Sequence, residues 1–107
     1  IITTDILTGL NSEGYPVKPG DLGENILVEG VPYSMFAVGR QYQFGLSTVV
    51  QITEPITPCS YLCTLPYLRE NGRCLALQKR LQGRRGWYAK VLTPGEVAVG
   101  GMVVALR

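Results

Sequence analysis

Three cysteines, Cys59, Cys63 and Cys74, are the side chains of this sequence with the most reactive chemistry. Pro58 cannot donate to a strand ladder, so the strand before it is expected to end there. If the residues from Ser60 onward are helical, Cys59 lies near a helix N-terminus, where the dipole and unpaired N–H groups favour the thiolate. A thiolate is the better nucleophile and a good ligand for soft metals. Cys59 is therefore the candidate catalytic residue and metal ligand; the alternative is a buried structural cysteine, as most free cysteines are.

The other two cysteines adjoin apolar, helix-like positions, which is typical of buried structural thiols. Cys63 follows Cys59 by one helical turn, so a resolving role for it is conceivable. An odd number of cysteines is a poor disulfide framework, so we expect free thiols, a reducing compartment and a cytoplasmic location. Histidine is absent, which excludes a Cys-His dyad and a zinc site of two cysteines and two histidines.

A glycine-rich segment at residues 20–26 is the second candidate, and it contains Glu24 and Asn25. Its glycines permit a tight backbone, and the adjacent carboxylate and amide could bind a polar ligand where a strand begins. The alternative is a turn that leads into a strand, with Asn25 bonded to local backbone, and the pattern alone favours this alternative. The segment is not a phosphate loop, because no Gly-Lys-Ser/Thr follows it.

The third candidate is a basic and aromatic segment at residues 83–90, in which Arg84 and Arg85 lie between glycines and precede Trp87 and Tyr88. Two guanidinium groups could clamp an anion, and the rings could stack on a planar ligand. RNA is an alternative ligand, but one short basic patch and a net charge of +2 are weak evidence, so we expect no nucleic-acid partner. The structural alternative is a solvated loop and a strand with Trp87 in the core.

The candidate residues are expected to lie on, or between, short helices and strands. Turn residues separate the following expected elements: a helix over 3–10; a strand over 25–29; a hairpin of 40–44 and 48–52; a helical region over 61–81, interrupted at 71–72; a strand over 87–92; and a closing strand pair of 97–99 and 102–106. No apolar run approaches the roughly 18–20 residues of a membrane span, and no signal peptide is visible, so we expect no membrane partner. This pattern predicts one mostly β domain over 1–107, a barrel or curled sheet with one or two short helices.

Together and in this order, the segments resemble the MOSC domain, a module found at the C-terminus of molybdenum cofactor sulfurases and in small stand-alone proteins. The resemblance spans nearly the whole chain and rests on residues 19–26, 29–30, 38–39, 58–59, 83–91 and 94–97. It implies a MOSC-like β-barrel and a pocket for the molybdenum cofactor (molybdopterin), a pterin dithiolene that carries phosphate. The family's N-terminal part usually carries a Gly-Asp-Arg type motif. That part would precede Ile1, so we expect the chain to lack this segment and part of the pocket.

The resemblance also implies roles for the candidate residues. Cys59 corresponds to the family's reactive cysteine, which carries a persulfide in sulfur-transfer members and binds molybdenum in amidoxime-reducing relatives. Asn25 and its neighbour Glu24 would belong to the cofactor pocket, and Arg84 and Arg85 would form its anion-binding side. The first hypothesis is thus a cofactor-binding or sulfur-carrier domain.

Two alternatives remain open at this point. One is a molybdenum-dependent reductase of N-hydroxylated compounds, which would need a separate reductase partner because no flavin or iron–sulfur motif is present. The other is a non-catalytic interaction domain in which Cys59 is merely packed. A sulfur carrier would instead need a sulfur-donor partner protein.

Overall fold

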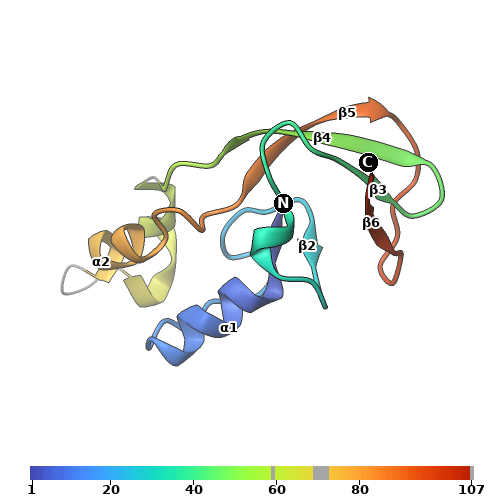
Figure 1. Cartoon of the computed structure of the whole chain (residues 1–107). Coiled ribbons are helices and arrows are strands. Elements are labelled where there is room, and N and C mark those ends of the chain that lie inside the picture. Colours follow the sequence, from blue (N-terminus) through green and yellow to red (C-terminus); the bar gives the residue numbers. More distant parts are fainter. Residues whose placement is uncertain (59, 69–72, 107) are drawn as a thin grey trace.

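A four-stranded antiparallel sheet and a group of short helices occupy opposite ends of an elongated fold, which measures 45 × 24 × 20 Å (Figure 1). This computed structural model describes residues 1–58, 60–68 and 73–106. The helical elements are α1 (Thr4–Ser12), α2 (Arg73–Arg80) and the short 3₁₀ helices η1 (Tyr33–Met35), η2 (Ser60–Thr64) and η3 (Pro66–Leu68). The strands are β1 (Ile2–Thr3), β2 (Leu27–Val28), β3 (Gln41–Phe44), β4 (Thr48–Pro55), β5 (Trp87–Thr93) and β6 (Val103–Ala105).

The predicted hairpin is the centre of the larger sheet, whose strand order is β5-β4-β3-β6. Tyr42, Phe44, Val50 and Ile52 alternate with more exposed residues and bury their side chains in one apolar cluster. The Tyr42 hydroxyl also donates to the carbonyl of Met35 at 2.6 Å, which ties η1 to the sheet. The alternation of apolar residues therefore predicted this part of the fold correctly.

The helical end has a core of its own. Ile6, Leu7 and Leu10 form the buried face of α1, as their spacing predicted, and they pack with residues of η3 and α2 such as Leu68 and Leu77. The expected helical region over 61–81 contains η2, η3 and α2 in its described part, and its expected interruption at 71–72 lies outside the described residues.

The short strands β1 and β2 connect the two ends. They pair in parallel, with Ile2 opposite Leu27, and the side chain of Ile2 belongs to the helical core whereas Val28 belongs to the core of the sheet. Ile1 and Trp87 exchange two backbone hydrogen bonds of 2.8 Å, so β1 also abuts the start of β5. The strands thus follow one another in space in the order β2, β1, β5, β4, β3, β6.

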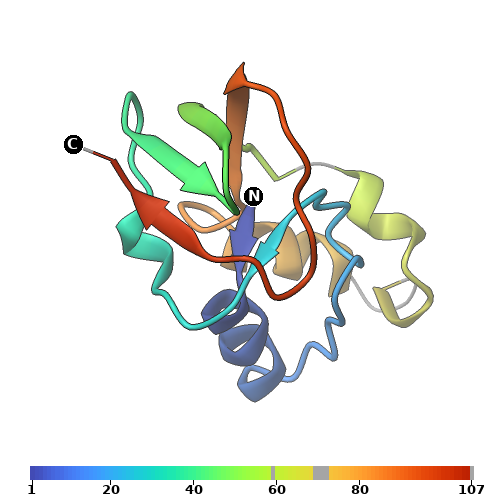
Figure 2. The same cartoon turned by 90° about the vertical axis from the view of Figure 1, so that its right-hand side faces the viewer.

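The predicted barrel is not closed within the described residues. β6 pairs only with β3 and β2 pairs only with β1, so the strand series has two free ends. The fold is a mixed α/β domain with an open, curved sheet (Figure 2). Of the predicted closing pair, β6 forms but residues 97–99 do not, because they belong to a loop whose turn joins the Gly101 amide to the Ala98 carbonyl at 3.0 Å. In the described part of the chain, no helix is long and apolar enough to span a membrane.

Candidate functional site

The glycine-rich segment and the basic segment of the sequence meet in the structure. Arg85 is 7% exposed, and its Nη2 atom donates a hydrogen bond of 2.5 Å to the backbone carbonyl of Leu22. A buried hydrogen bond from a charged group is among the stronger interactions of this kind. Arg85 therefore holds the loop that contains Glu24 against the start of β5.

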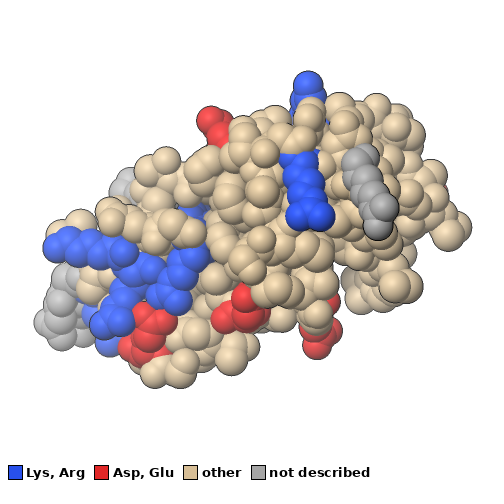
Figure 3. All heavy atoms as spheres, viewed as in Figure 1, with Lys and Arg blue, Asp and Glu red and all other residues tan. Residues whose placement is uncertain are grey.

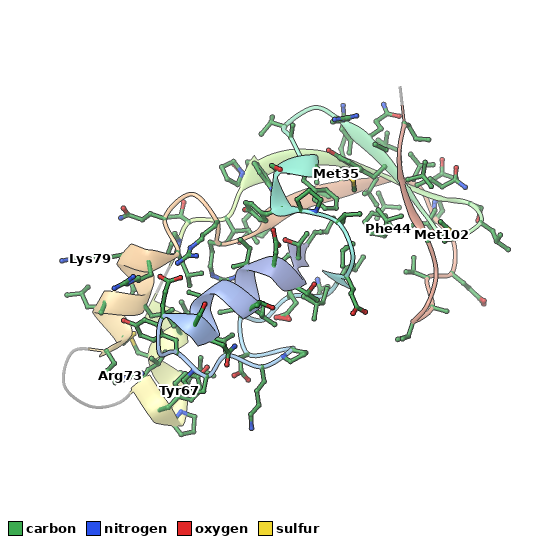
Figure 4. The ribbon with its side chains drawn as sticks, turned by 60° about the horizontal axis from the view of Figure 1, so that its bottom comes forward. Met35, Phe44, Tyr67, Arg73, Lys79 and Met102 are labelled. Atoms are coloured by element: carbon green, nitrogen blue, oxygen red, sulfur yellow. A yellow bond between two sulfur atoms is a disulfide. The ribbon has the colours of Figure 1, made fainter. Side chains whose placement is uncertain are left out.

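Two carboxylates of the glycine-rich loop, those of Asp21 and Glu24, accept hydrogen bonds that fix the conformation of the loop. Glu24 accepts a hydrogen bond from the Gly20 amide at 2.7 Å through Oε2. Asp21 accepts hydrogen bonds from the Lys18 amide at 3.0 Å and from the Tyr67 hydroxyl at 2.9 Å. Tyr67 belongs to η3 and points toward this loop (Figure 4). Burial, reinforced by the hydrogen bond to Asp21, raises the pKa of Tyr67, so Tyr67 stays a neutral donor that ties the loop to the η2–η3 segment.

The backbone of Ile1 fixes the start of β1 against the basic segment. The Ile1 nitrogen donates to the Trp87 carbonyl at 2.8 Å, and the Trp87 amide donates to the Ile1 carbonyl at 2.8 Å. Trp87, two residues after Arg85, is therefore held beside β1.

The polar cluster, which we define as Glu24, Arg85 and Trp87, contacts the residue after β4 through Gly86. Its carbonyl accepts a hydrogen bond from the Ile56 amide at 2.9 Å, and its amide donates to the Tyr33 hydroxyl at 3.0 Å. A side chain at this position would force its neighbours to shift, because an added Cβ would lie 3.0 Å from the Ile1 carbonyl oxygen and 3.3 Å from Ile56 Cδ1. Pro58 and Cys59 follow Ile56 closely in the sequence, so this hydrogen bond fixes the backbone that leads to them.

An aromatic pair covers the cluster. Tyr33 and Trp87 stack with ring centroids 5.5 Å apart and an angle of 22° between their planes. Sequence reasoning placed Trp87 in the core and did not find Tyr33, whose position after Pro32 carries no periodic signal. Burial raises the pKa of Tyr33, so its hydroxyl keeps its proton, while its oxygen accepts the Gly86 amide.

Three buried polar atoms of this cluster have no hydrogen-bond partner among the described residues: Glu24 Oε1, Arg85 Nε and Trp87 Nε1. Buried polar atoms are nearly always satisfied, and an exception calls for an explanation such as a missing ligand. The set offers one acceptor and two donors. A carboxylate can accept the N–H groups of a pterin ring, and a guanidinium with an indole N–H can donate to a phosphate oxygen. The cluster therefore carries an acceptor and donors of the kinds that the polar groups of the molybdenum cofactor would require.

The remaining predicted site residues lie in different surroundings. Arg84 donates from Nη2 to both carboxylate oxygens of Glu13 at 2.8 Å, and from Nε to the Arg80 carbonyl at 2.6 Å. Its guanidinium thus joins α1 to α2, within the basic region of the helical end (Figure 3). Asn25 is exposed beside Glu24, and Cys59 lies outside the described residues. No group of three or more His, Cys, Asp or Glu side chains within the described ranges could hold a metal ion.

The expectation of free thiols is wrong for Cys63 and Cys74, which form a disulfide with a Cα–Cα distance of 5.1 Å. The 3₁₀ helix η2 packs against α2 and brings the two residues within disulfide range. Gln78 Nε2 lies 3.4 Å from the sulfur of Cys74 and 3.7 Å from that of Cys63. Cys63 is therefore not a free resolving thiol for Cys59.

Comparisons with known proteins agree with this architecture. The MOSC domain family matches residues 1–104. Among solved structures, YiiM from Geobacillus stearothermophilus superposes with a TM-score of 0.77 at 24% identity, over 99% of this chain and 52% of that chain. YiiM from Escherichia coli gives a TM-score of 0.73 at 22% identity, over 99% and 52%.

The YuaD protein from Bacillus subtilis gives a TM-score of 0.81 at 21% identity, over 95% of this chain and 59% of that chain. This chain thus spans little more than half the length of these three structures. No curated protein matches the sequence significantly.

Proposed function

The chain belongs to the MOSC domain family, which is associated with the molybdenum cofactor, and from that premise we propose that it binds this cofactor or carries sulfur for it through Cys59. The observation that carries the proposal is the set of buried polar atoms on Glu24, Arg85 and Trp87 that have no hydrogen-bond partner among the residues that the structure describes. These atoms come from the two sequence segments that the family resemblance singled out.

The polar cluster would orient the cofactor rather than react with it. The hydrogen bond from Nη2 already fixes the side chain of Arg85. Its Nε can therefore donate to an anion with little further loss of side-chain entropy. Glu24 is likewise held through Oε2, which leaves Oε1 to accept hydrogen bonds from a ligand. Side chains that are fixed before binding lose little entropy on binding, which favours recognition of one ligand orientation.

Cys59 would supply the thiolate. It follows Pro58 and directly precedes η2, and the Ile56–Gly86 hydrogen bond joins its segment to the polar cluster. When bound, the cofactor would supply the molybdenum centre, and the thiolate would either bind this metal or hold a sulfur atom as a persulfide. A sulfur-carrier role would require a sulfur-donor protein, and a reductase role would require an electron-donor protein.

The test is the metal and sulfur content of the protein purified from a host that makes the cofactor. We expect molybdenum by elemental analysis, or a mass increase of one sulfur atom on Cys59, in the wild-type chain. Cys59→Ser should abolish both signals. The double variant Cys63→Ser/Cys74→Ser is the matched control, because it removes two sulfurs and keeps Cys59. Neither signal in the wild type, or equal signals in Cys59→Ser, would contradict the proposal.

A further inference from the structure

The disulfide between Cys63 and Cys74 joins two sulfur atoms that differ in exposure. Cys63 belongs to η2 and is partly exposed, whereas Cys74 belongs to α2 and is 8% exposed. A thiolate opens a disulfide by attacking one of its two sulfurs, and the reaction requires access to the attacked sulfur. Cys63 is therefore the sulfur that an external thiolate can reach, and Cys74 is the sulfur that leaves.

The side-chain amide of Gln78 lies beside both sulfur atoms. Its Nε2 atom is 3.4 Å from Cys74 Sγ and 3.7 Å from Cys63 Sγ. Gln78 and Cys74 are four residues apart on α2, so the helix itself keeps this contact after the disulfide is broken. The contact with Cys63 instead crosses to η2 and depends on the packing of the two helices.

The position of Gln78 selects the same leaving sulfur. An N–H group that donates to a sulfur stabilises its thiolate form, and a stabilised thiolate leaves faster in thiol–disulfide exchange. Because the donor stays with Cys74 and not with Cys63, the Cys74 thiolate is the easier one to form. Access and leaving-group stabilisation thus favour the same direction of attack.

Positive charges flank this site. Arg73 precedes Cys74 and Lys79 follows Gln78, and Arg80 comes next in α2. The described residues at 60–68 and 73–80 include no carboxylate side chain. Basic side chains gather at this end of the molecule (Figure 3). A thiol that carries carboxylates of its own would therefore be attracted to the site.

We propose that the Cys63–Cys74 disulfide is a thiol-exchange site, at which a small anionic thiol becomes bound to Cys63. The thiolate sulfur of the incoming molecule forms a bond with Cys63 Sγ as the bond between Cys63 and Cys74 breaks. The electron pair of the broken bond goes to Cys74 Sγ, which leaves as a thiolate beside Gln78. The incoming thiol loses its proton to water and is oxidised to the mixed disulfide while Cys74 is reduced, so no further oxidant is required.

The exchange is reversible in a folded protein. It removes the covalent link between η2 and α2 but leaves their apolar contacts, since Leu62 and Leu77 both belong to the helical core. The Cys74 thiolate can then attack the mixed disulfide and restore the original bond. The site does not involve the polar cluster or Cys59, so this proposal can fail without affecting the proposed function.

The test uses the full chain with Cys59→Ser, in its disulfide form, and reduced glutathione as the probe thiol. The reaction is stopped in acid at early times, free thiols are alkylated, and the modified peptides are identified by mass spectrometry. We expect glutathione on Cys63 and the alkylating group on Cys74, in about tenfold excess over the reverse product. Equal amounts of the two products, glutathione mainly on Cys74, or no opening of the disulfide would overturn the proposal.

Gln78→Met tests the role of the amide, because methionine keeps the length of the side chain and lacks the N–H groups. We expect it to slow the opening by glutathione about three- to tenfold. A variant that merely loosened the packing would speed the opening instead. Gln82→Met is the matched control, because Gln82 is exposed beyond the end of α2. An unchanged or faster rate in Gln78→Met would show that the amide does not assist the leaving sulfur.

Cysteamine, a small thiol with a positively charged amino group, tests the preference for an anionic thiol. The rate of each thiol with the protein is divided by its rate with a small model disulfide, which corrects for its thiolate fraction and nucleophilicity. We expect the larger ratio for glutathione at low ionic strength, and a smaller difference when salt is added. An equal or larger ratio for cysteamine would overturn the assignment of an anionic thiol.

Discussion

The guanidinium of Arg85 donates a hydrogen bond of 2.5 Å to the carbonyl of Leu22, across 63 residues of sequence. This bond joins the two segments that each seemed ambiguous in the sequence. It also leaves Nε of Arg85 free of a partner among the described residues, next to the loop that contains Glu24. Arg85 therefore has a structural role through one nitrogen and a candidate binding role through another.

Arg85→Met should loosen the glycine-rich loop. The substitution keeps the apolar length of the side chain but leaves the buried Leu22 carbonyl without its donor, which typically costs about 1–3 kcal/mol. We expect faster hydrogen exchange of the Gly23 amide and a lower free energy of unfolding. Arg84→Met is the matched control, because Arg84 contacts Glu13 and the Arg80 carbonyl instead. The same loosening of Gly23 in both variants would show that the Leu22 bond does not hold the loop.

Gly86→Ala should be more destabilising than Gly83→Ala. Both glycines have positive φ values, 128° and 81°, which an alanine adopts only with strain. The added methyl group at position 86 would also meet the Ile1 carbonyl oxygen at 3.0 Å, whereas position 83 has no neighbour within 4 Å. We expect about 1 kcal/mol of destabilisation for Gly83→Ala and about 2–4 kcal/mol for Gly86→Ala in denaturant unfolding. Equal losses would mean that only backbone strain, and not the contact with Ile1, matters at Gly86.

The disulfide makes a direct prediction about thiol reactivity. Two of the three cysteines are bonded to each other, so one thiol per chain, Cys59, should react with a thiol reagent under non-reducing native conditions. After unfolding and reduction, all three should react, as counted by mass spectrometry.

Loss of the disulfide should also lower stability, by about 2–4 kcal/mol, because the cross-link restricts the unfolded chain. The comparison is between Cys63→Ser/Cys74→Ser and the wild type in thermal unfolding. Three reactive thiols in the native, unreduced protein would contradict this bond.

Apolar periodicity predicted the elements that bury a face, such as α1 and the β3–β4 hairpin, because burial imposes the pattern directly. The same reasoning failed at residues 97–99, where an apolar run lacks a neighbouring strand within the described residues and forms a loop. A strand requires a neighbouring strand to pair with as well as a suitable pattern of apolar residues. The sequence of one segment does not reveal which segment, if any, pairs with it.

The candidate site was predictable only in part. The resemblance directed attention to Glu24 and Arg85, but neighbouring arginines look equivalent in a sequence, and tertiary contacts alone show that Arg84 faces Glu13. Tyr33 was missed because its stacking on Trp87 is a long-range contact with no local signal. The Cys63–Cys74 bond was missed for the same reason, since the packing of η2 on α2 creates it.

Glu13 should make the stability of the helical end depend on acidic pH. The hydrogen bond from Arg84, together with that from Arg80, lowers the pKa of Glu13 below its ordinary value of 4.5, although partial burial opposes the shift. A lowered pKa in the folded state means that the stabilisation is complete above the unfolded value and is lost as the pH falls through the folded value.

The measurement is the melting temperature of the wild type, Glu13→Gln, Arg84→Ala and the double variant from neutral pH to well below 4.5. We expect the wild type to melt higher than Glu13→Gln at neutral pH and the difference to vanish in acid, because the protonated glutamate no longer pairs with the guanidinium groups. The loss in the double variant should be smaller than the sum of the two single losses, since both substitutions remove the Arg84–Glu13 contact. Additive effects, or a difference between wild type and Glu13→Gln that persists in acid, would show that Glu13 acts through packing and not through its charge.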